Sequence, residues 1–278
     1  MIVLTGGTGK LGSQVVDQLL RRLPAEEIGV SVRDPGRAAG LAGRGVRVRR
    51  GDFADPDSLA EAFEGATQVL VVSTDQTGEA TLAGHAAAID AARDAGVKRV
   101  LYTSHQGAAA DSLFAPMPDH AATERRLAVS GPAFTALRNG FYASTVPLLL
   151  GRARETGELV APADGPVSWT AHADLAEAAA IILAGEGRFD GPTPPLTAPV
   201  ALDLDDVARL LSDLGGRPVR RVVVDDEEWA AGLGVPAAQA ELLLGMFRAA
   251  RRGEFATTGP DLEDLLGRPA TPLRSLLE

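Results

Sequence analysis

The sequence predicts an α/β fold with a doubly wound parallel sheet and a smaller C-terminal α/β lobe. Three observations predict it. Short apolar runs alternate with stretches of helical periodicity through the first half of the chain. A glycine-rich turn follows the first apolar run, and prolines become frequent after Gly151. Repeated alternation of strand and helix favours a parallel sheet with right-handed crossovers.

The predicted strands are rich in Val, Ile and Leu and cover residues 2–5, 28–32, 46–50, 68–72, 99–103 and 134–138. The predicted helices between them cover residues 11–23, 36–42, 57–63, 79–95 and 120–130. Asp55-Pro56 is typical of a helix start, and Gly96 is typical of a helix stop. Because ligands bind beyond the carboxyl ends of parallel strands, we expect the functional residues just after each predicted strand.

The second half of the chain has a different pattern. Helices are predicted at residues 174–184, 204–214, 237–251 and 261–266, with a short strand at 219–224. We interpret residues 1–150 as the main, nucleotide-binding domain. Residues 151–278 are interpreted as a smaller lobe on the substrate side that shares segments with the main domain.

Composition excludes several classes of function. The chain has 278 residues, of which 45% are hydrophobic, and a net charge of -10 that disfavours nucleic acid as a partner. The absence of cysteine excludes disulfides and thiolate chemistry, and the four histidines show no metal-ligand spacing, so no metal is predicted. No apolar run approaches the roughly 18 residues of a membrane span, and no signal peptide is visible. We therefore expect a cytoplasmic protein without a membrane partner.

The glycine-rich turn carries the strongest functional signal. It follows a predicted strand and opens a predicted helix, which is the context of a Rossmann dinucleotide fingerprint. Gly6 permits the tight turn, Gly9 lets the backbone approach a pyrophosphate, and Gly12 allows close packing of the helix on the sheet. The helix N-terminus then offers N–H groups to the phosphates. The predicted phosphate-binding residues are Gly6, Thr8, Gly9, Lys10, Leu11 and Gly12.

The end of the second predicted strand favours NADP(H) over NAD(H). Arg33 stands where an acidic residue would bind a ribose 2′-OH, and a guanidinium suits a 2′-phosphate instead. Arg37 offers a second contact, and Asp34 is interpreted as a helix cap. After the third strand, Asp52 is placed to accept from the adenine amino group and Phe53 to lie beside the ring. The alternatives are a solvated surface arginine at Arg33 and a helix-capping role for Asp52.

With these motifs in hand, the chain resembles the atypical short-chain dehydrogenase/reductase superfamily. It is most similar to the NmrA-like branch that includes the type 2 quinone oxidoreductases. The resemblance covers most of the chain and rests on residues 5–12, 32–35, 51–53, 102–104, 120–124 and 137–142. It implies NADPH binding and a two-lobed fold. It also implies that the ribose and nicotinamide are lined by Ser73, Thr74, Ser104, Asn139, Gly140, Phe141 and Tyr142.

The Tyr-x-x-x-Lys pair of the wider superfamily is missing. The only tyrosines are Tyr102 and Tyr142, and the residues four positions later are Gln106 and Val146. In other members the tyrosine donates a proton to the forming alkoxide, and the lysine lowers its pKa. This chain therefore needs another proton donor or a reaction that needs none.

His120 and Glu124 stand at the equivalent spacing, on one face of a predicted helix. Imidazole titrates near pH 6.5, so His120 is a candidate acid. Glu124 is expected to hydrogen-bond His120 or the cofactor ribose. The alternative is that His120 caps the helix and Glu124 is solvated. We name His120 and Tyr142 as the catalytic candidates, with His105 and its neighbour Gln106 as further residues that contact substrate.

The leading hypothesis is an NADPH-dependent oxidoreductase that passes hydride to a quinone or a similar electron-poor carbonyl or enone, with a quinone or an aromatic ketone as the expected substrate. The alternatives are a non-catalytic NADP(H) sensor that binds a protein partner, and a tailoring reductase of aromatic natural products. A simple ketone becomes a strongly basic alkoxide and needs an acid worth about 10²–10⁴-fold in rate. A quinone becomes a stabilised phenolate-like anion that water protonates later. The missing tyrosine–lysine pair therefore favours quinones, and a homodimer is left open.

Overall fold

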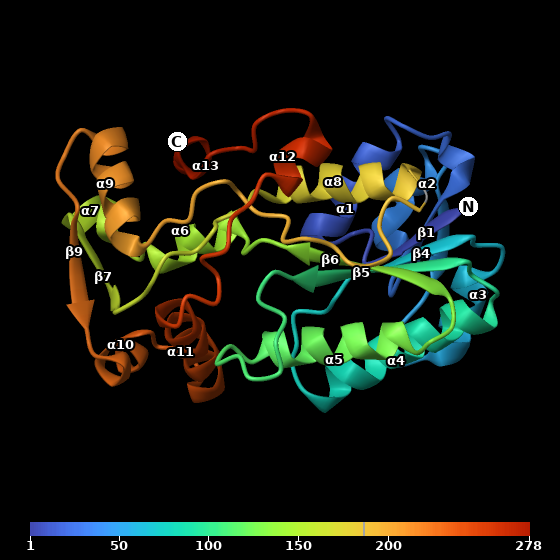
Figure 1. The fold of residues 1–278 in the computed structure, drawn as a ribbon, viewed down its shortest axis with the longest axis horizontal. Coiled ribbons are helices and arrows are strands. Elements are labelled where there is room, and N and C mark those ends of the chain that lie inside the picture. The colour runs from blue at the N-terminus through green and yellow to red at the C-terminus, as the bar shows by residue number, and fades with distance from the viewer. Residues whose placement is uncertain (186) are drawn as a thin grey trace.

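The computed structural model describes residues 1–185 and 187–278, and its centre is a seven-stranded sheet (Figure 1). The strands lie in the order β3-β2-β1-β4-β5-β6-β8, and every pairing is parallel, which confirms the predicted fold class. Their bounds are β1 (Ile2–Thr5), β2 (Ile28–Val32), β3 (Arg47–Arg50), β4 (Gln68–Val71), β5 (Arg99–His105), β6 (Ala133–Asn139) and β8 (Gly191–Pro192). The strand order reverses between β1 and β4, where open α/β sheets bind ligands.

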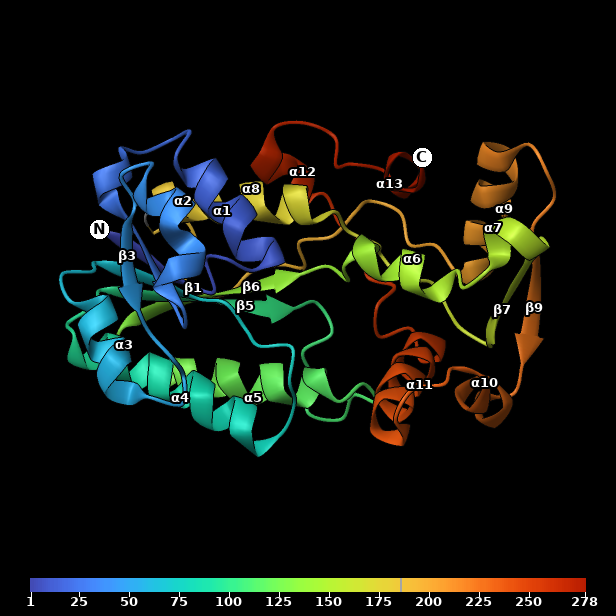
Figure 2. The ribbon, with the colours of Figure 1, turned by 180° about the vertical axis from the view of Figure 1, so that it is seen from behind.

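Helices cover both faces of the sheet (Figures 1 and 2). One face carries α1 (Lys10–Leu19), α2 (Ala39–Ala42), α8 (His172–Ala184) and α12 (Asp261–Leu266). The other carries α3 (Pro56–Phe63), α4 (Glu79–Asp94) and α5 (Pro116–Ala128). The central strands β1, β2, β4 and β5 are buried on both sides, and in β1, for example, Leu4 belongs to the first apolar layer and Val3 to the second. This burial explains their near-continuous apolar sequence.

A second, two-stranded parallel sheet pairs β7 (Glu158–Pro162) with β9 (Arg220–Val224). Around it lie α6 (Val146–Leu149), α7 (Ala153–Thr156), α9 (Leu204–Gly215), α10 (Asp226–Gly232) and α11 (Ala237–Arg251), and α13 (Leu273–Leu277) ends the chain. The tips of β5 and β6 point toward this lobe (Figures 1 and 2). The segment after residue 150 contributes to both parts of the fold. It forms the small sheet, and it also adds β8 to the edge of the large sheet and packs α8 and α12 against one face of that sheet.

Several predicted boundaries were wrong. The helix predicted at residues 120–130 begins at Pro116, because a proline in the first turn loses no helical hydrogen bond. The helix predicted at 11–23 ends at Leu19. β5 extends to His105 through pairing with β6, and β7 and β8 were not predicted at all. β8 has only two residues, one of them a proline, so its pairing depends on tertiary contact rather than on sequence pattern.

Among the described residues, no helix combines the length and the apolar character that crossing a membrane requires.

Candidate functional site

The glycine-rich turn joins β1 to α1 in a compact loop tied to β2. The Gly6 amide, at φ +63°, donates to the Ser31 carbonyl at 3.2 Å, and the Gly9 amide donates back to the Gly6 carbonyl at 2.9 Å. A Cβ on Gly12 would lie 2.2 Å from the Gly6 oxygen, so α1 packs against the turn itself rather than only against the sheet. A Cβ on Gly7 would lie 2.6 Å from a methyl of Val30, a packing role that the sequence did not indicate.

The N-terminus of α1 has the features of an anion site. Its N-cap is Gly9, which provides no side-chain hydrogen bond, and no acidic residue lies in the first turn. Thr8, Gly9 and Lys10 are exposed, whereas the Leu11 side chain is buried in the core, so Leu11 offers an anion only its backbone amide. Unpaired amides at the positive end of a helix fit a pyrophosphate, so these residues are compatible with a bound dinucleotide.

Two exposed guanidinium groups follow β2. Arg33 directly follows the strand, and Arg37 lies in the short 3₁₀ helix of Pro35–Ala38. Neither makes a side-chain hydrogen bond or ion pair with any residue that the structure describes. Asp34 caps the 3₁₀ helix, as predicted, because its Oδ1 accepts from the Gly36 amide at 2.9 Å. Both arginines are therefore available for a phosphate.

Asp52 and Phe53 follow β3. Asp52 Oδ1 accepts from the Ala54 amide at 3.1 Å, within its own loop. The alternative that Asp52 caps α3 is wrong, because the N-cap of that helix is Asp55. Phe53 packs against α4: its ring centroid lies 6.1 Å from that of His85, and a Cβ on Gly84 would lie 3.1 Å from Phe53 Cβ.

Ser73 and Thr74 follow β4 and are bound to the neighbouring elements. The Ser73 amide donates to Thr103 Oγ1 at 2.8 Å, and the two hydroxyls lie 3.0 Å apart. The Thr74 amide donates to His85 Nε2 at 3.4 Å, and His85 Nδ1 lies 3.1 Å from Thr123 Oγ1. Burial lowers the pKa of His85 to about 4, so this histidine is neutral, and its two ring nitrogens hydrogen-bond Thr74 and Thr123. Ser73 and Thr74, which follow β4, are thereby fixed next to the end of β5.

Glu124 is buried and forms a three-way contact with β5 and β6. It accepts from Ser104 Oγ at 2.6 Å and from Arg138 Nε and Nη2 at 3.0 and 2.7 Å. The expected hydrogen bond to His120 is absent among the described residues. A guanidinium fork is the stronger partner for a carboxylate, and Arg138 lies within reach on the adjacent strand. Ser104 and Glu124 thus lie together, a contact that the sequence did not predict.

His120 binds Tyr102 instead. Its Nδ1 lies 2.8 Å from the Tyr102 hydroxyl, and its ring stacks on His105 with centroids 6.2 Å apart. The alternative that His120 caps the helix is wrong, because the N-cap of α5 is Ala115. Burial, with a smaller contribution from His85, lowers the pKa of His120 to about 3. A neutral imidazole at this position is a weaker candidate for an acid than the sequence suggested.

The segment after β6 runs into the interior. Asn139 is buried with its Oδ1 unpartnered, and a Cβ on Gly140 would lie 2.1 Å from Thr170 Oγ1. The Tyr142 ring lies against His172 on α8 with centroids 4.2 Å apart. Burial and then the charge of Lys10 lower the pKa of His172 to about 4, so the phosphate turn is close to this pair. Tyr142 therefore packs on the face of the sheet that carries α1 and α8.

An aromatic cluster at the ends of β5 and β6 was missed by sequence reasoning. Phe141 is at its centre, with ring centroids of four neighbours 5.0 to 5.8 Å away: His105, Phe114, Trp169 and Phe255. These residues come from distant segments, so no spacing indicated the cluster. Gln106, which was predicted to contact substrate, makes hydrogen bonds within the protein instead. Its Nε2 donates to the Phe255 carbonyl, and its Oε1 accepts from Ser168.

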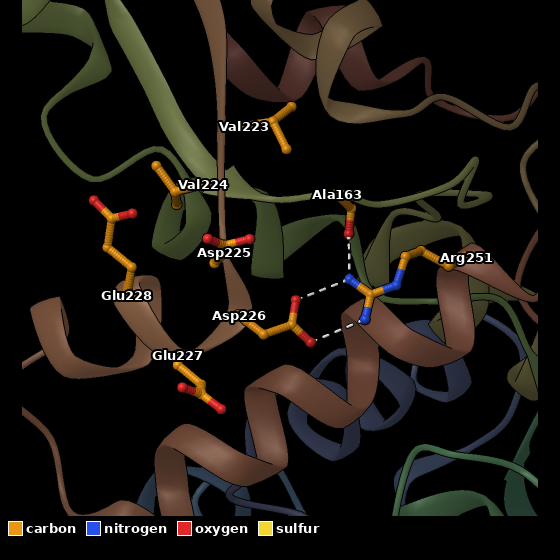
Figure 3. A pocket seen from close by; sticks show the side chains of 8 residues that line it. All are labelled: Ala163, Val223, Val224, Asp225, Asp226, Glu227, Glu228 and Arg251. Atoms are coloured by element: carbon orange, nitrogen blue, oxygen red, sulfur yellow. Dashed lines mark hydrogen bonds and ion pairs between the residues drawn. The ribbon is translucent and has the colours of Figure 1, made fainter.

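The smaller lobe contains an open hollow of about 690 Å³, lined by Ala163, Val223, Val224, Asp225, Asp226, Glu227, Glu228 and Arg251 (Figure 3). Arg251 pairs there with Asp226 at 2.9 Å and donates to the Ala163 carbonyl at 2.8 Å. None of the predicted site residues lines it. Within residues 1–185 and 187–278, no group of three or more His, Asp or Glu side chains is arranged to hold a metal ion.

Comparison with known proteins agrees with this geometry. The family model described as NAD(P)H-binding matches residues 6–184. The chain is 33% identical to quinone oxidoreductase 2 of Escherichia coli, over 98% of this chain and 96% of that protein. It is 31% identical to an NmrA-like family domain-containing oxidoreductase of Aspergillus flavus, with 98% and 92% coverage. It is 33% identical to an NAD(P)H azoreductase of Xenophilus azovorans, with 97% and 94% coverage.

Two solved structures share the fold over nearly their whole length. A NADPH-dependent quinone oxidoreductase of Escherichia coli, complexed with NADPH, has a TM-score of 0.93 and 32% identity, covering 100% of this chain and 98% of that one. Citrobacter sp. triphenylmethane reductase, complexed with NADP(H), has a TM-score of 0.90 and 34% identity, covering 99% and 98%. The predicted resemblance is confirmed: the chain belongs to the NAD(P)H-binding, NmrA-like family of oxidoreductases.

Proposed function

We propose that the protein is a NADPH-dependent oxidoreductase that passes hydride to a quinone or to a similarly electron-poor conjugated acceptor. The aromatic cluster around Phe141 carries the proposal, because it adjoins the carboxyl ends of β5 and β6, where the predicted nicotinamide-lining residues lie. Aromatic side chains give a flat conjugated acceptor large apolar contact area.

The cofactor side has separate residues for each part of NADPH. The amides at the start of α1 bind the pyrophosphate, and Arg33 and Arg37 bind the 2′-phosphate. Asp52 and Phe53 hold the adenine. Ser73, Thr74, Ser104, Glu124, Asn139, Gly140, Phe141 and Tyr142 border the ribose and nicotinamide. Among the residues that border the ribose and nicotinamide, Asn139 has a buried Oδ1 that accepts no hydrogen bond from the described residues.

The chemistry of the acceptor follows from the residues near it. Bound NADPH supplies a hydride, and the acceptor that takes it becomes an anion. His120 is neutral at pH 7, Tyr102 keeps its proton because burial raises its pKa, and neither tyrosine has a lysine four residues on. A strong acid is therefore lacking, and an acceptor whose anion is already stabilised is favoured.

The substrates in the names of the relatives support this class. Quinones, azo dyes and triphenylmethane dyes are conjugated, electron-poor molecules. We extend that common chemistry, and not any single compound, to this chain.

The test is NADPH oxidation by the protein against matched quinones, azo dyes and simple aromatic ketones. We expect turnover of quinones or dyes with kcat/KM at least about 10²-fold above that of the ketones, because only the alkoxide needs prompt protonation. Ketones reduced as well as quinones would contradict the proposal. Tight NADPH binding without turnover of any acceptor would favour the sensor hypothesis.

Two variants separate the two halves of the site. Phe114→Ala removes one wall of the aromatic cluster and is expected to lower kcat/KM for quinone while leaving the Kd for NADPH unchanged. Arg33→Ala is expected to have the opposite effect: it raises the Kd for NADPH and leaves kcat/KM for quinone unchanged. If Phe114→Ala changed both parameters equally, the assignment of the cluster to the acceptor would be wrong.

A further inference from the structure

His105 and His120 form a pair of imidazoles at the end of β5, and the Nδ1 atom of each ring already makes a hydrogen bond within the protein. His105 Nδ1 accepts from the Gly107 amide at 3.0 Å. His120 Nδ1 lies 2.8 Å from the Tyr102 hydroxyl. No described residue accepts a hydrogen bond from Nε2 of either ring, and neither Nε2 is among the fully enclosed unpartnered atoms.

These contacts determine the tautomers. A backbone amide can only donate, so neutral His105 carries its proton on Nε2. A phenol is a stronger hydrogen-bond donor than a neutral imidazole, and the imidazole nitrogen is the stronger acceptor, so Tyr102 donates to His120 Nδ1. His120 then also carries its proton on Nε2. Burial lowers the pKa of both histidines and raises that of Tyr102, so all three groups are neutral near pH 7.

We propose that Tyr102 and the Gly107 amide hold His120 and His105 as two neutral Nε2–H donors that bind the acceptor oxygen and stabilise the negative charge it gains. The two ring centroids lie 6.2 Å apart at an interplanar angle of 24°, so the two imidazoles are immediate neighbours. His105 also contacts Phe141 and Phe255, so the donors border the aromatic cluster. The inference rests on the proposed function.

The two donors replace the missing acid without transferring a proton. The acceptor gains hydride with its electron pair and becomes an oxyanion, which both N–H groups hold in a water-poor site. Water protonates the oxyanion after it leaves, and both histidines end the cycle in the state in which they began. Tyr102 acts as a positioning residue, since it contacts His120 and not the acceptor.

Imidazole ¹⁵N NMR tests the tautomers independently of turnover. The chain has only four histidines, so the spectrum is simple. We expect Nε2–H for His105 and His120 and the opposite Nδ1–H for His85, whose Nε2 accepts from the Thr74 amide. We expect none of the three to titrate between pH 5 and pH 8. His85, Asp119, Glu124 and Tyr142 are the titratable groups that influence His120 or Tyr102, and His85 is itself neutral in this range.

The conservative variant Tyr102→Phe tests positioning. It is expected to release His120 into a mixture of tautomers, with a roughly 3- to 10-fold loss in quinone kcat and little change in KM. The matched control Tyr142→Phe removes the only other tyrosine hydroxyl and is expected to leave the His120 tautomer unchanged. A single Nδ1–H tautomer at His120 in the parent would overturn the proposal.

A phenolate probe tests binding of the oxyanion. 4-Nitrophenol added to the NADP⁺-loaded protein is expected to bind as its anion and to shift the Nε2–H signals of both His105 and His120. Binding without either shift, or no binding, would overturn this inference. Absence of quinone turnover with both shifts present would instead count against the proposed function alone. A rate limb near pH 6.5 that disappears in His120→Ala with a loss of 10²-fold or more would show proton transfer and also overturn the inference.

Discussion

Glu124 on α5 and Arg138 on β6 form a bidentate pair, with Nε–Oε1 and Nη2–Oε2 distances of 3.0 and 2.7 Å. The carboxylate is almost fully buried, and the guanidinium is 32% exposed. Such forks are stronger than single hydrogen bonds and fix geometry. This pair therefore joins α5, which carries His120, to the strand that ends at Asn139.

Glu124→Gln is expected to lower the free energy of unfolding by about 1.5–3 kcal/mol, because it leaves the partly buried Arg138 without its counter-charge. The matched control Glu158→Gln breaks the exposed pair with Arg220 and is expected to cost about 0–1 kcal/mol. Chemical denaturation of both variants checks this. Equal losses would mean that burial adds nothing to the Glu124 pair.

Arg33→Ala is expected to weaken NADPH binding roughly 10- to 100-fold, since a charge-assisted hydrogen bond contributes about 1.5–3 kcal/mol. NADH lacks the 2′-phosphate, so its affinity is expected to change little. Arg21→Ala, an exposed arginine beyond the opposite end of α1, is the control and is expected to change neither. Titration with both cofactors decides the point, and a parallel loss of NADH affinity would refute the assignment.

Gly12→Ala is expected to destabilise the protein by about 1–3 kcal/mol and to weaken NADPH binding, because the new Cβ would lie 2.2 Å from the Gly6 carbonyl oxygen. Gly40→Ala is the control: nothing lies within 4 Å of its Cβ, and alanine in that helix is expected to be neutral or to stabilise by up to about 1 kcal/mol. Thermal unfolding and cofactor titration measure both effects. Wild-type affinity in Gly12→Ala would rule out a rigid turn.

Stability is expected to fall as the pH drops from 6.5 toward 4. The pKa of His85 is lowered from 6.5 to about 4 by burial, so the unfolded chain takes up a proton in this window that the folded protein does not. The stabilisation is complete above pH 6.5 and is lost on acidification, by up to about 1.4 kcal/mol per pH unit for such a histidine.

His85→Gln keeps a donor and an acceptor and removes this titration. Urea denaturation at steps between pH 5 and pH 6.5 is expected to show a shallower slope in the variant, with the two curves parallel above pH 7. Parallel curves throughout the window would mean that His85 keeps its ordinary pKa.

The sequence by itself determined the parallel sheet, the position of the dinucleotide turn and the family. These features depend on local chemistry: apolar runs alternate with helical periodicity, and glycines stand where a Cβ would collide with backbone. The cap at Asp34 was also readable, because an aspartate before a proline satisfies the amides of the next turn.

Only the tertiary structure decided which side chains meet. His120 and Glu124 share a helix face, yet Tyr102 on β5 binds the first and Arg138 on β6 binds the second. The aromatic cluster joins residues as far apart in the chain as Phe114 and Phe255. Spacing along a helix determines only which residues share a face. Their partners, and through burial their pKa values, depend on which strands the fold places opposite that face.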